Sequence, residues 1–217
     1  MSDVSTINGY AALYADIMAE VKARHTALFQ PLDGITAAAL PSYVLAEAAY
    51  LQLRMICELI AHGCLVAHGD IEATKRGKLE TAWNADLIVS ALSKLHPEFY
   101  PTPSHQVVLG PGRFELREVT EPYLTKADLQ RLYAETGRVL HRGSVQNLPG
   151  RTVPTSNSVR DWSEKISFLL THHQIVLANS DLEIWCLMHG MDDGKVHTTV
   201  MRRSASDAPL TKTLNKT

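Results

Sequence analysis

The sequence predicts a mainly α-helical chain with a small antiparallel sheet in its C-terminal part. Apolar residues recur at helical spacing in five segments up to residue 173, which indicates a helical bundle over residues 1–173. The longest of these segments, 41–69, is apolar over most of its circumference, as is typical of a buried helix. The spacing then changes to short alternating runs, which predict a three-strand meander over 174–203, followed by a disordered tail over 204–217.

The first three helices are predicted from their apolar spacing and from their breakers. A short arm, residues 1–9, precedes a helix that starts at Tyr10 and ends before Pro31. The second helix begins at Pro41, a residue favoured in the first turn, and runs to about Gly69. A third helix follows as far as Pro97, and its apolar face includes Trp83. This pattern places Trp83 in the core.

The second half of the bundle is interrupted by an irregular excursion. Residues 96–124 are dense in proline and glycine, and they hold two short candidate strands, 106–109 and 114–119. A fourth helix begins near Thr125, where Asp128 three residues later resembles a capping box. A Gly/Pro/Asn/Ser loop over 143–157 leads into a fifth helix. The predicted strands after it are 174–178, 183–189 and 196–203, separated by turn residues.

Composition excludes several classes of protein. The chain has 217 residues and a formal net charge of -2, so a general nucleic-acid coating role is not expected. No apolar run is long enough for a membrane span, no signal peptide is recognised, and three cysteines without CxxC spacing fit a reducing compartment. We therefore expect a cytoplasmic protein without membrane contact. The ten histidines lack the spacing of known metal motifs, and neither a metal nor a cofactor is expected.

One polar stripe runs along the otherwise apolar segment 41–69. Helical spacing places five side chains on one side of it: Glu47, Tyr50, Arg54, Glu58 and His62. Arg54 and Glu58, four residues apart, can pair within the helix. One interpretation is an internal ion pair that orients packed helices. The other is a charged pocket floor on which Arg54 binds an anion such as phosphate, with Glu47 and His62 beside it.

The fourth predicted helix carries a complementary face. Tyr133, Gly137 and His141 follow one another at intervals of four residues. Gly137 permits another helix to approach closely, and the long helix is the expected neighbour. A protonated imidazole at His141 is favoured by the dipole at the end of this helix. His141 is therefore either a residue of a functional site or a simple cap of the last carbonyl groups.

These two signatures, Arg54-x-x-x-Glu58 and Tyr133-x-x-x-Gly137-x-x-x-His141, resemble those of the HEPN-like helical bundles. The likeness spans roughly residues 40–145 and is greatest to a divergent bacterial branch related to abortive-infection proteins. It implies a bundle of four or five helices that forms a homodimer. In active members an Arg and a His at the dimer cleft cleave RNA without a metal. The His transfers protons and the Arg holds the phosphate.

The chain departs from the usual arrangement of the catalytic pair, Arg-x(4–6)-His on one helix. Arg138 lies only three residues before His141, and no other pair fits the spacing. By resemblance His141 takes the position of the catalytic His, while Arg54 or Arg138 would supply the guanidinium. Four arginines and no acidic residue lie between 138 and 160, and Arg138 and Arg142 are candidates for phosphate contact. Alternatively these arginines belong to a solvated loop.

The resulting hypothesis is a HEPN-like protein of a bacterial defence or toxin–antitoxin system, acting as a metal-independent endoribonuclease. Its proposed catalytic residues are His141, Arg54, Glu58 and Tyr133. RNA and a cognate antitoxin or defence-system protein would be its partners. The alternative is a non-catalytic HEPN-like dimer that binds a protein partner or a nucleotide, and a structural oligomer component is the third interpretation.

Overall fold

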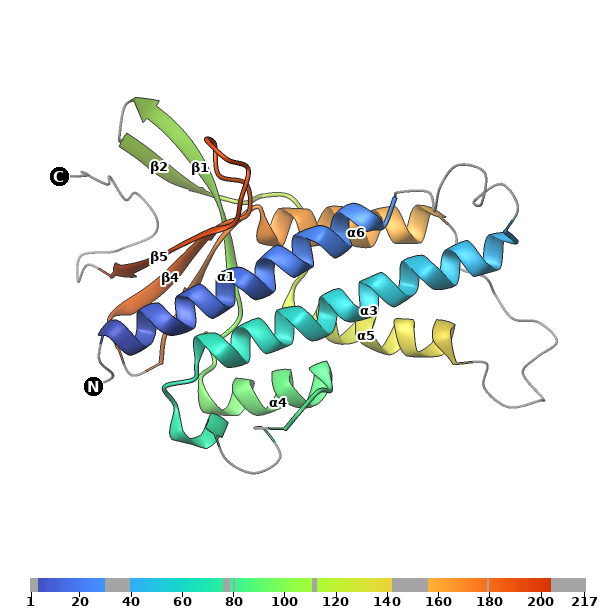
Figure 1. Ribbon diagram of the computed structural model, residues 1–217, viewed down its shortest axis with the longest axis horizontal. Coiled ribbons are helices and arrows are strands. Elements are labelled where there is room, and N and C mark those ends of the chain that lie inside the picture. The colour runs from blue at the N-terminus through green and yellow to red at the C-terminus, as the bar shows by residue number, and fades with distance from the viewer. Residues whose placement is uncertain are drawn as a thin grey trace.

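The computed structural model describes residues 4–29, 40–75, 79, 81–110, 113–141, 156–178 and 180–203. These residues form a helical bundle with a sheet across one end (Figure 1). The expectation of a mainly α-helical chain with an antiparallel sheet is confirmed at this level. The helices are α1 (Val4–Ala27), α3 (Ser42–Ala67), α4 (Ala85–Leu95), α5 (Lys126–Leu140) and α6 (Ser156–Leu170), with a short 3₁₀ helix, η1 (Glu72–Lys75).

The long helix α3 lies at the centre of the bundle. It packs against α1, α4, α5 and α6, so most of its circumference is covered. Leu53, Ile56 and Ile60 are essentially inaccessible to solvent, and Cys57 and Cys64 are buried beside them. This arrangement explains why the segment is apolar nearly all round. The helix begins one residue after Pro41, close to the predicted start.

The sheet has five antiparallel strands in the order β2-β1-β3-β4-β5. The strands are β1 (Thr102–Gly110), β2 (Arg113–Glu118), β3 (His172–Val176), β4 (Leu182–Leu187) and β5 (His197–Arg202). The predicted three-strand meander is therefore incomplete, because the strands expected inside the excursion 96–124 belong to the same sheet. Only Thr102 and Pro103 pair with β3, and β1 then continues outward with β2 as a hairpin (Figure 1).

Two further predictions, both about the N-terminal half of the chain, are wrong. Residues 1–9 were expected to form an arm, yet α1 begins at Val4 and Ile7 is buried in the core. The predicted third helix is shorter, because the Asn84 side chain accepts a hydrogen bond from the Leu87 N–H and starts α4 at residue 85. Trp83 consequently lies outside the helix, and 66% of it is exposed instead of forming core.

The start of α5 agrees with the predicted capping box. The Thr125 hydroxyl accepts a hydrogen bond from the Asp128 N–H, and the Asp128 carboxylate accepts one from the Thr125 N–H. These reciprocal bonds fix where α5 begins and thereby which face it turns towards α3. The loop expected over 143–157 and the tail expected over 204–217 lie outside the described residues, apart from the beginning of α6.

Buried histidines join the sheet to the helices. His173 accepts a hydrogen bond from the Tyr14 hydroxyl at 2.6 Å and donates one to the Leu170 carbonyl at 3.0 Å. His172 lies next to it on β3 and contacts the Ser104 hydroxyl at 2.6 Å. Burial lowers the pKa of both imidazoles to about 4. Both are therefore neutral components of the core at neutral pH.

Candidate functional site between α3 and α5

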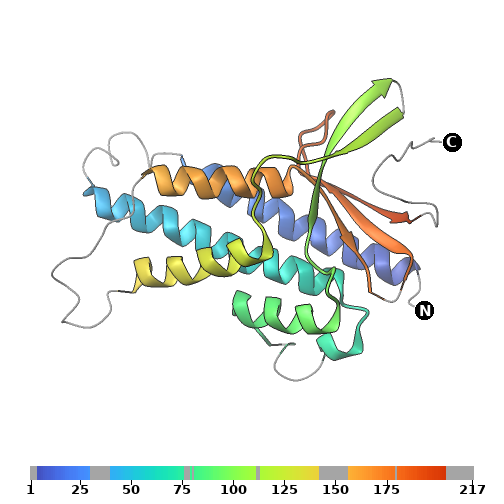
Figure 2. The same cartoon turned by 180° about the vertical axis from the view of Figure 1, so that it is seen from behind.

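The candidate site lies where α5 packs against α3, two helices that run side by side in both views (Figures 1 and 2). The contacts show that the two helices are antiparallel. Tyr133 reaches Glu58, and four residues later Gly137 lies beside Arg54, one helical turn earlier on α3. The two faces that the sequence singled out therefore meet along this seam.

Arg54, Glu58 and Tyr133 form a closed triangle of two hydrogen bonds and one ion pair. Arg54 Nη2 donates to the Tyr133 hydroxyl at 2.7 Å, and Arg54 Nε lies 3.2 Å from Glu58 Oε1. The Tyr133 hydroxyl in turn donates to Glu58 Oε1 at 3.1 Å. The centre of the guanidinium also lies 4.2 Å from the centroid of the Tyr133 ring, a cation–π distance. Three of the four proposed catalytic residues are thus in direct contact.

The triangle is largely removed from water. The Arg54 and Glu58 side chains are 20% and 15% exposed, and Tyr133 is buried. Burial raises the pKa of Tyr133, the Glu58 carboxylate raises it further, and the Arg54 charge opposes both effects. The phenol consequently keeps its proton at neutral pH and can donate to Glu58. The balanced charges of Arg54 and Glu58 allow both side chains to be sheltered.

Gly137 brings the backbone of α5 close to the arginine. A Cβ atom at this position would lie 3.7 Å from Arg54 Nη1. The edge of the guanidinium that carries Nη1 therefore points towards Gly137, while Nε and Nη2 are held by Glu58 and Tyr133. Arg54 is thereby held in one orientation, with one edge beside Gly137.

His141 is one turn beyond Gly137, at the end of α5. It is the C-cap residue, its N–H donates to the Gly137 carbonyl at 3.0 Å, and its side chain is exposed. Among the described residues, Arg54 forms an ion pair with Glu58 and a hydrogen bond with Tyr133, and it makes neither contact with His141. Arg138 is also exposed near this end. Arg142 lies outside the described residues.

The remaining predicted residues occupy the two ends of the α3 stripe. His62 Nε2 donates to the Ala82 carbonyl at 3.0 Å, which directs this imidazole to the segment before α4 and away from the triangle. Glu47 is partly buried near the start of α3. Tyr50 donates to Glu135 Oε1 at 2.5 Å, and burial together with that carboxylate raises the pKa of Tyr50. The stripe is thus a series of separate contacts.

Glu135 is a site residue that the sequence reasoning missed. It lies two residues after Tyr133, so helical spacing directs it away from the Tyr133-Gly137-His141 face. Glu135 joins Tyr50 to a hollow of about 380 Å³, which is lined by Arg131, Glu135, Ser158, Asp161, Trp162 and Lys165. Arg131 and Lys165 lie 5.0 and 5.5 Å from the Trp162 ring centroid. The acidic and basic residues around this hollow balance each other.

The chain matches no protein-family model, no curated protein and no solved structure. In the part of the chain that the structure describes, no helix is both long and apolar enough to cross a bilayer.

Proposed function

We propose that this chain is a HEPN-like protein of a bacterial defence or toxin–antitoxin system that cleaves RNA without a metal at the α3–α5 seam. The observation that carries the proposal is the fixed orientation of Arg54, which Glu58 and Tyr133 hold beside Gly137 and on the side of α5 that ends in His141. The proposal keeps the resemblance to HEPN-like proteins as its premise.

In this proposal Arg54 and His141 have different tasks. Arg54 Nη1 contacts a phosphate oxygen and stabilises the charge that develops there, an interaction favoured by partial burial. His141 is exposed and takes or gives a proton at the 2′-OH or at the leaving oxygen. Glu58 and Tyr133 position the guanidinium. The exposed Arg138, together with Arg142, adds attraction for the RNA backbone.

A second candidate function is a non-catalytic HEPN-like dimer that binds a protein partner or a nucleotide. Two observations favour it. Glu58 and Tyr133 already engage two of the three guanidinium nitrogens of Arg54, and the chain lacks the Arg-x(4–6)-His spacing. A paired arginine of this kind can orient α3 and α5 without taking part in a reaction.

The test uses the purified full chain, a fluorescein-labelled single-stranded RNA and EDTA at low salt. Binding is followed by fluorescence anisotropy and cleavage by gel electrophoresis, for wild type and His141→Ala. His105→Ala is the matched control, because His105 is a partly exposed histidine on the β1–β2 hairpin that pairs with Glu121.

We expect wild type and His105→Ala to bind and cleave the RNA, and His141→Ala to bind it without cleavage. General acid–base catalysis contributes about 10²–10⁴-fold to rates, so the loss should be easily measured. Intact RNA with retained binding would favour the non-catalytic candidate. RNA that is neither bound nor cleaved by wild type would overturn both the nuclease proposal and RNA as the partner.

A further inference from the structure

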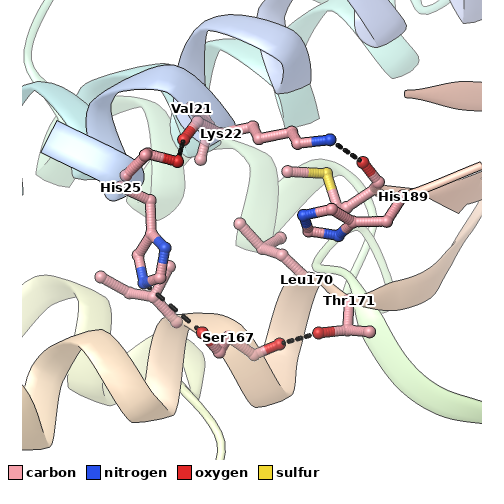
Figure 3. Close-up of a pocket in the computed structure, with 10 residues that line it drawn as sticks. Val21, Lys22, His25, Ser167, Leu170, Thr171 and His189 are labelled. Carbon is pink, nitrogen blue, oxygen red and sulfur yellow. Dashed lines mark hydrogen bonds between the residues drawn. The ribbon is translucent and has the colours of Figure 1, made fainter. Parts of the chain in front are cut away.

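A second polar site lies on the other side of the bundle, between α1, α6 and the turn that joins β4 to β5. A hollow of about 60 Å³ is enclosed there by residues from all three elements (Figure 3). Its polar lining consists of Lys22, His25, Thr26, Ser167, Thr171 and His189, and its apolar lining of Val21, Ile166, Leu170 and Met188. None of these residues belongs to the α3–α5 seam.

Lys22 is aimed at the β4–β5 turn. Its ammonium group donates to the Met188 carbonyl at 2.9 Å and to the Gly194 carbonyl. An ammonium group has three hydrogens, and these two contacts use two of them. Both partners are neutral carbonyl groups, and among the described residues no carboxylate forms an ion pair with Lys22.

His25 lies across the hollow from His189 (Figure 3). Its Nε2 atom lies 3.1 Å from the Ser163 carbonyl, an acceptor, so Nε2 carries a hydrogen. The Ser163 hydroxyl lies 2.8 Å from the same nitrogen, and the Ser167 hydroxyl 3.4 Å from it. The second ring nitrogen, Nδ1, is not part of these contacts.

His189 completes the cluster from the opposite wall. Partial burial lowers the pKa of His189, and the neighbouring positive groups Lys22 and His25 lower it further. Burial is the largest of these effects, and the His189 imidazole is therefore mainly neutral at neutral pH. Ser167 and Thr171 form the lower edge of the hollow in Figure 3, and the Thr171 hydroxyl donates to the Ser167 carbonyl at 2.8 Å.

Charge in this hollow is one-sided. Among the described residues that line it, three can be positive and none carries a carboxylate. The titratable groups that face the hollow are Lys22 and His25 from α1 and His189 from the turn, while α6 contributes hydroxyl and apolar groups. The Asp193 carboxylate of the same turn is outside the lining and contacts His197 and the Lys195 N–H.

We propose that this hollow binds a tetrahedral oxyanion, either free phosphate or sulfate or the phosphoryl group of a small molecule. Lys22 contacts its oxygens as a charged donor, the anion favours the protonated form of His189 beside it, and nearby hydroxyl groups complete the shell. Charge-assisted donors of this kind are the usual ligands of phosphate in proteins. The volume of about 60 Å³ accommodates one such group and excludes the remainder of a larger ligand.

An anion here would also link three elements. Lys22 already fastens α1 to the turn, and His25 fastens α1 to α6 through Ser163. A bound oxyanion would neutralise the like charges that these contacts bring together. Binding and folding are linked, so a ligand of the folded chain raises its midpoint of thermal unfolding.

The test is calorimetric titration of the full chain with sodium sulfate at constant ionic strength, at about pH 6 and about pH 8. Sulfate is chosen because its charge stays constant over this range. The variants are His189→Gln, on an exposed side chain, and Lys22→Gln, with His105→Gln as the control from the β1–β2 hairpin. Titrations with inorganic phosphate and with glycerol 3-phosphate distinguish a free ion from a phosphoryl group.

We expect one sulfate per chain, tighter binding at the lower pH, and about tenfold weaker binding for each of the two site variants. His105→Gln should bind as wild type does. If glycerol 3-phosphate binds as tightly as inorganic phosphate, the ligand is a phosphoryl group. If inorganic ions bind more tightly than glycerol 3-phosphate, the ligand is a free oxyanion. Absence of binding by wild type, or unchanged binding by His189→Gln in a folded chain, would overturn the proposal.

Discussion

The two polar clusters of this protein are built on opposite electrostatic principles. In the α3–α5 seam, the Arg54 guanidinium is matched by the Glu58 carboxylate and the Tyr133 hydroxyl. In the α1–α6 hollow, the contacts of Lys22 and His25 with described residues are to carbonyl and hydroxyl groups, and His189 faces them. The first cluster is nearly balanced within itself, whereas the second would be balanced by an added anion. Removing one partner of a buried charge pair is costly, whereas a group of like charges favours an oppositely charged ligand.

The largest expected effect is a loss of stability at acid pH, which limits the pH range in which the two clusters can be compared. Burial lowers the pKa of His172 and of His173 from 6.5 to about 4. Between these values the unfolded chain binds protons that the folded chain does not. The free energy of unfolding should therefore fall as the pH falls from about 6.5 to about 4, by about 1.4 kcal/mol per pH unit for each histidine.

Urea unfolding at a series of pH values measures this slope. His105→Gln, which removes a partly exposed histidine, should leave the slope unchanged. A free energy of unfolding that stays constant from pH 7 to pH 5 would show that His172 and His173 are not the buried neutral groups described above.

The next largest expected effect is a difference in stability between losing the sheltered Arg54–Glu58 pair and losing a matched surface pair. Arg24 and Glu20 of α1 have the same four-residue spacing as Arg54 and Glu58, but they are 28% and 48% exposed. Arg54→Ala leaves the sheltered Glu58 without its cation and should destabilise the fold by about 2–3 kcal/mol. Arg24→Ala should cost less than about 1 kcal/mol. Equal losses in the free energy of urea unfolding for the two variants would contradict this difference between the sheltered and the exposed ion pair.

The smallest effect concerns the glycine that faces Arg54. A Cβ at Gly137 would lie 3.7 Å from Arg54 Nη1, an ordinary contact, so Gly137→Ala should stabilise α5 by up to about 1 kcal/mol. Gly63→Ala is the matched comparison, because a Cβ there would lie 2.9 Å from the buried Tyr14 ring and should destabilise the fold. The two melting temperatures should move in opposite directions, and a fall for Gly137→Ala would contradict the geometry described.

The sequence predicted the local features of this molecule better than its long-range contacts. The capping box of Thr125 and Asp128 and the apolar circumference of α3 depend on residues close in the chain, and both agree with the structure. The pairing of β1 with β3 joins Thr102 to Gln174 and leaves no local signature. Trp83 fits the apolar spacing of a helix, but the Asn84 cap starts α4 after it.

The same division holds for the candidate site. Four-residue spacing was enough to pair Arg54 with Glu58 and to place Tyr133 and Gly137 on one face. It did not reveal Glu135, which meets Tyr50 only because α3 and α5 pack in one particular register. Nor did it reveal the α1–α6 hollow, whose basic residues Lys22 and His189 lie more than 160 positions apart in the sequence.

The most direct measurement of the central claim is RNA binding by Arg54→Gln and by Arg24→Gln, each titrated with the fluorescein-labelled RNA at two salt concentrations. Glutamine keeps much of the side-chain length and removes the charge. If the α3–α5 seam contacts RNA phosphate, Arg54→Gln should bind more weakly and with a smaller salt dependence, while Arg24→Gln should bind as wild type does. Unchanged affinity and salt dependence for a folded Arg54→Gln would contradict the claim and leave Arg54 as a purely structural residue.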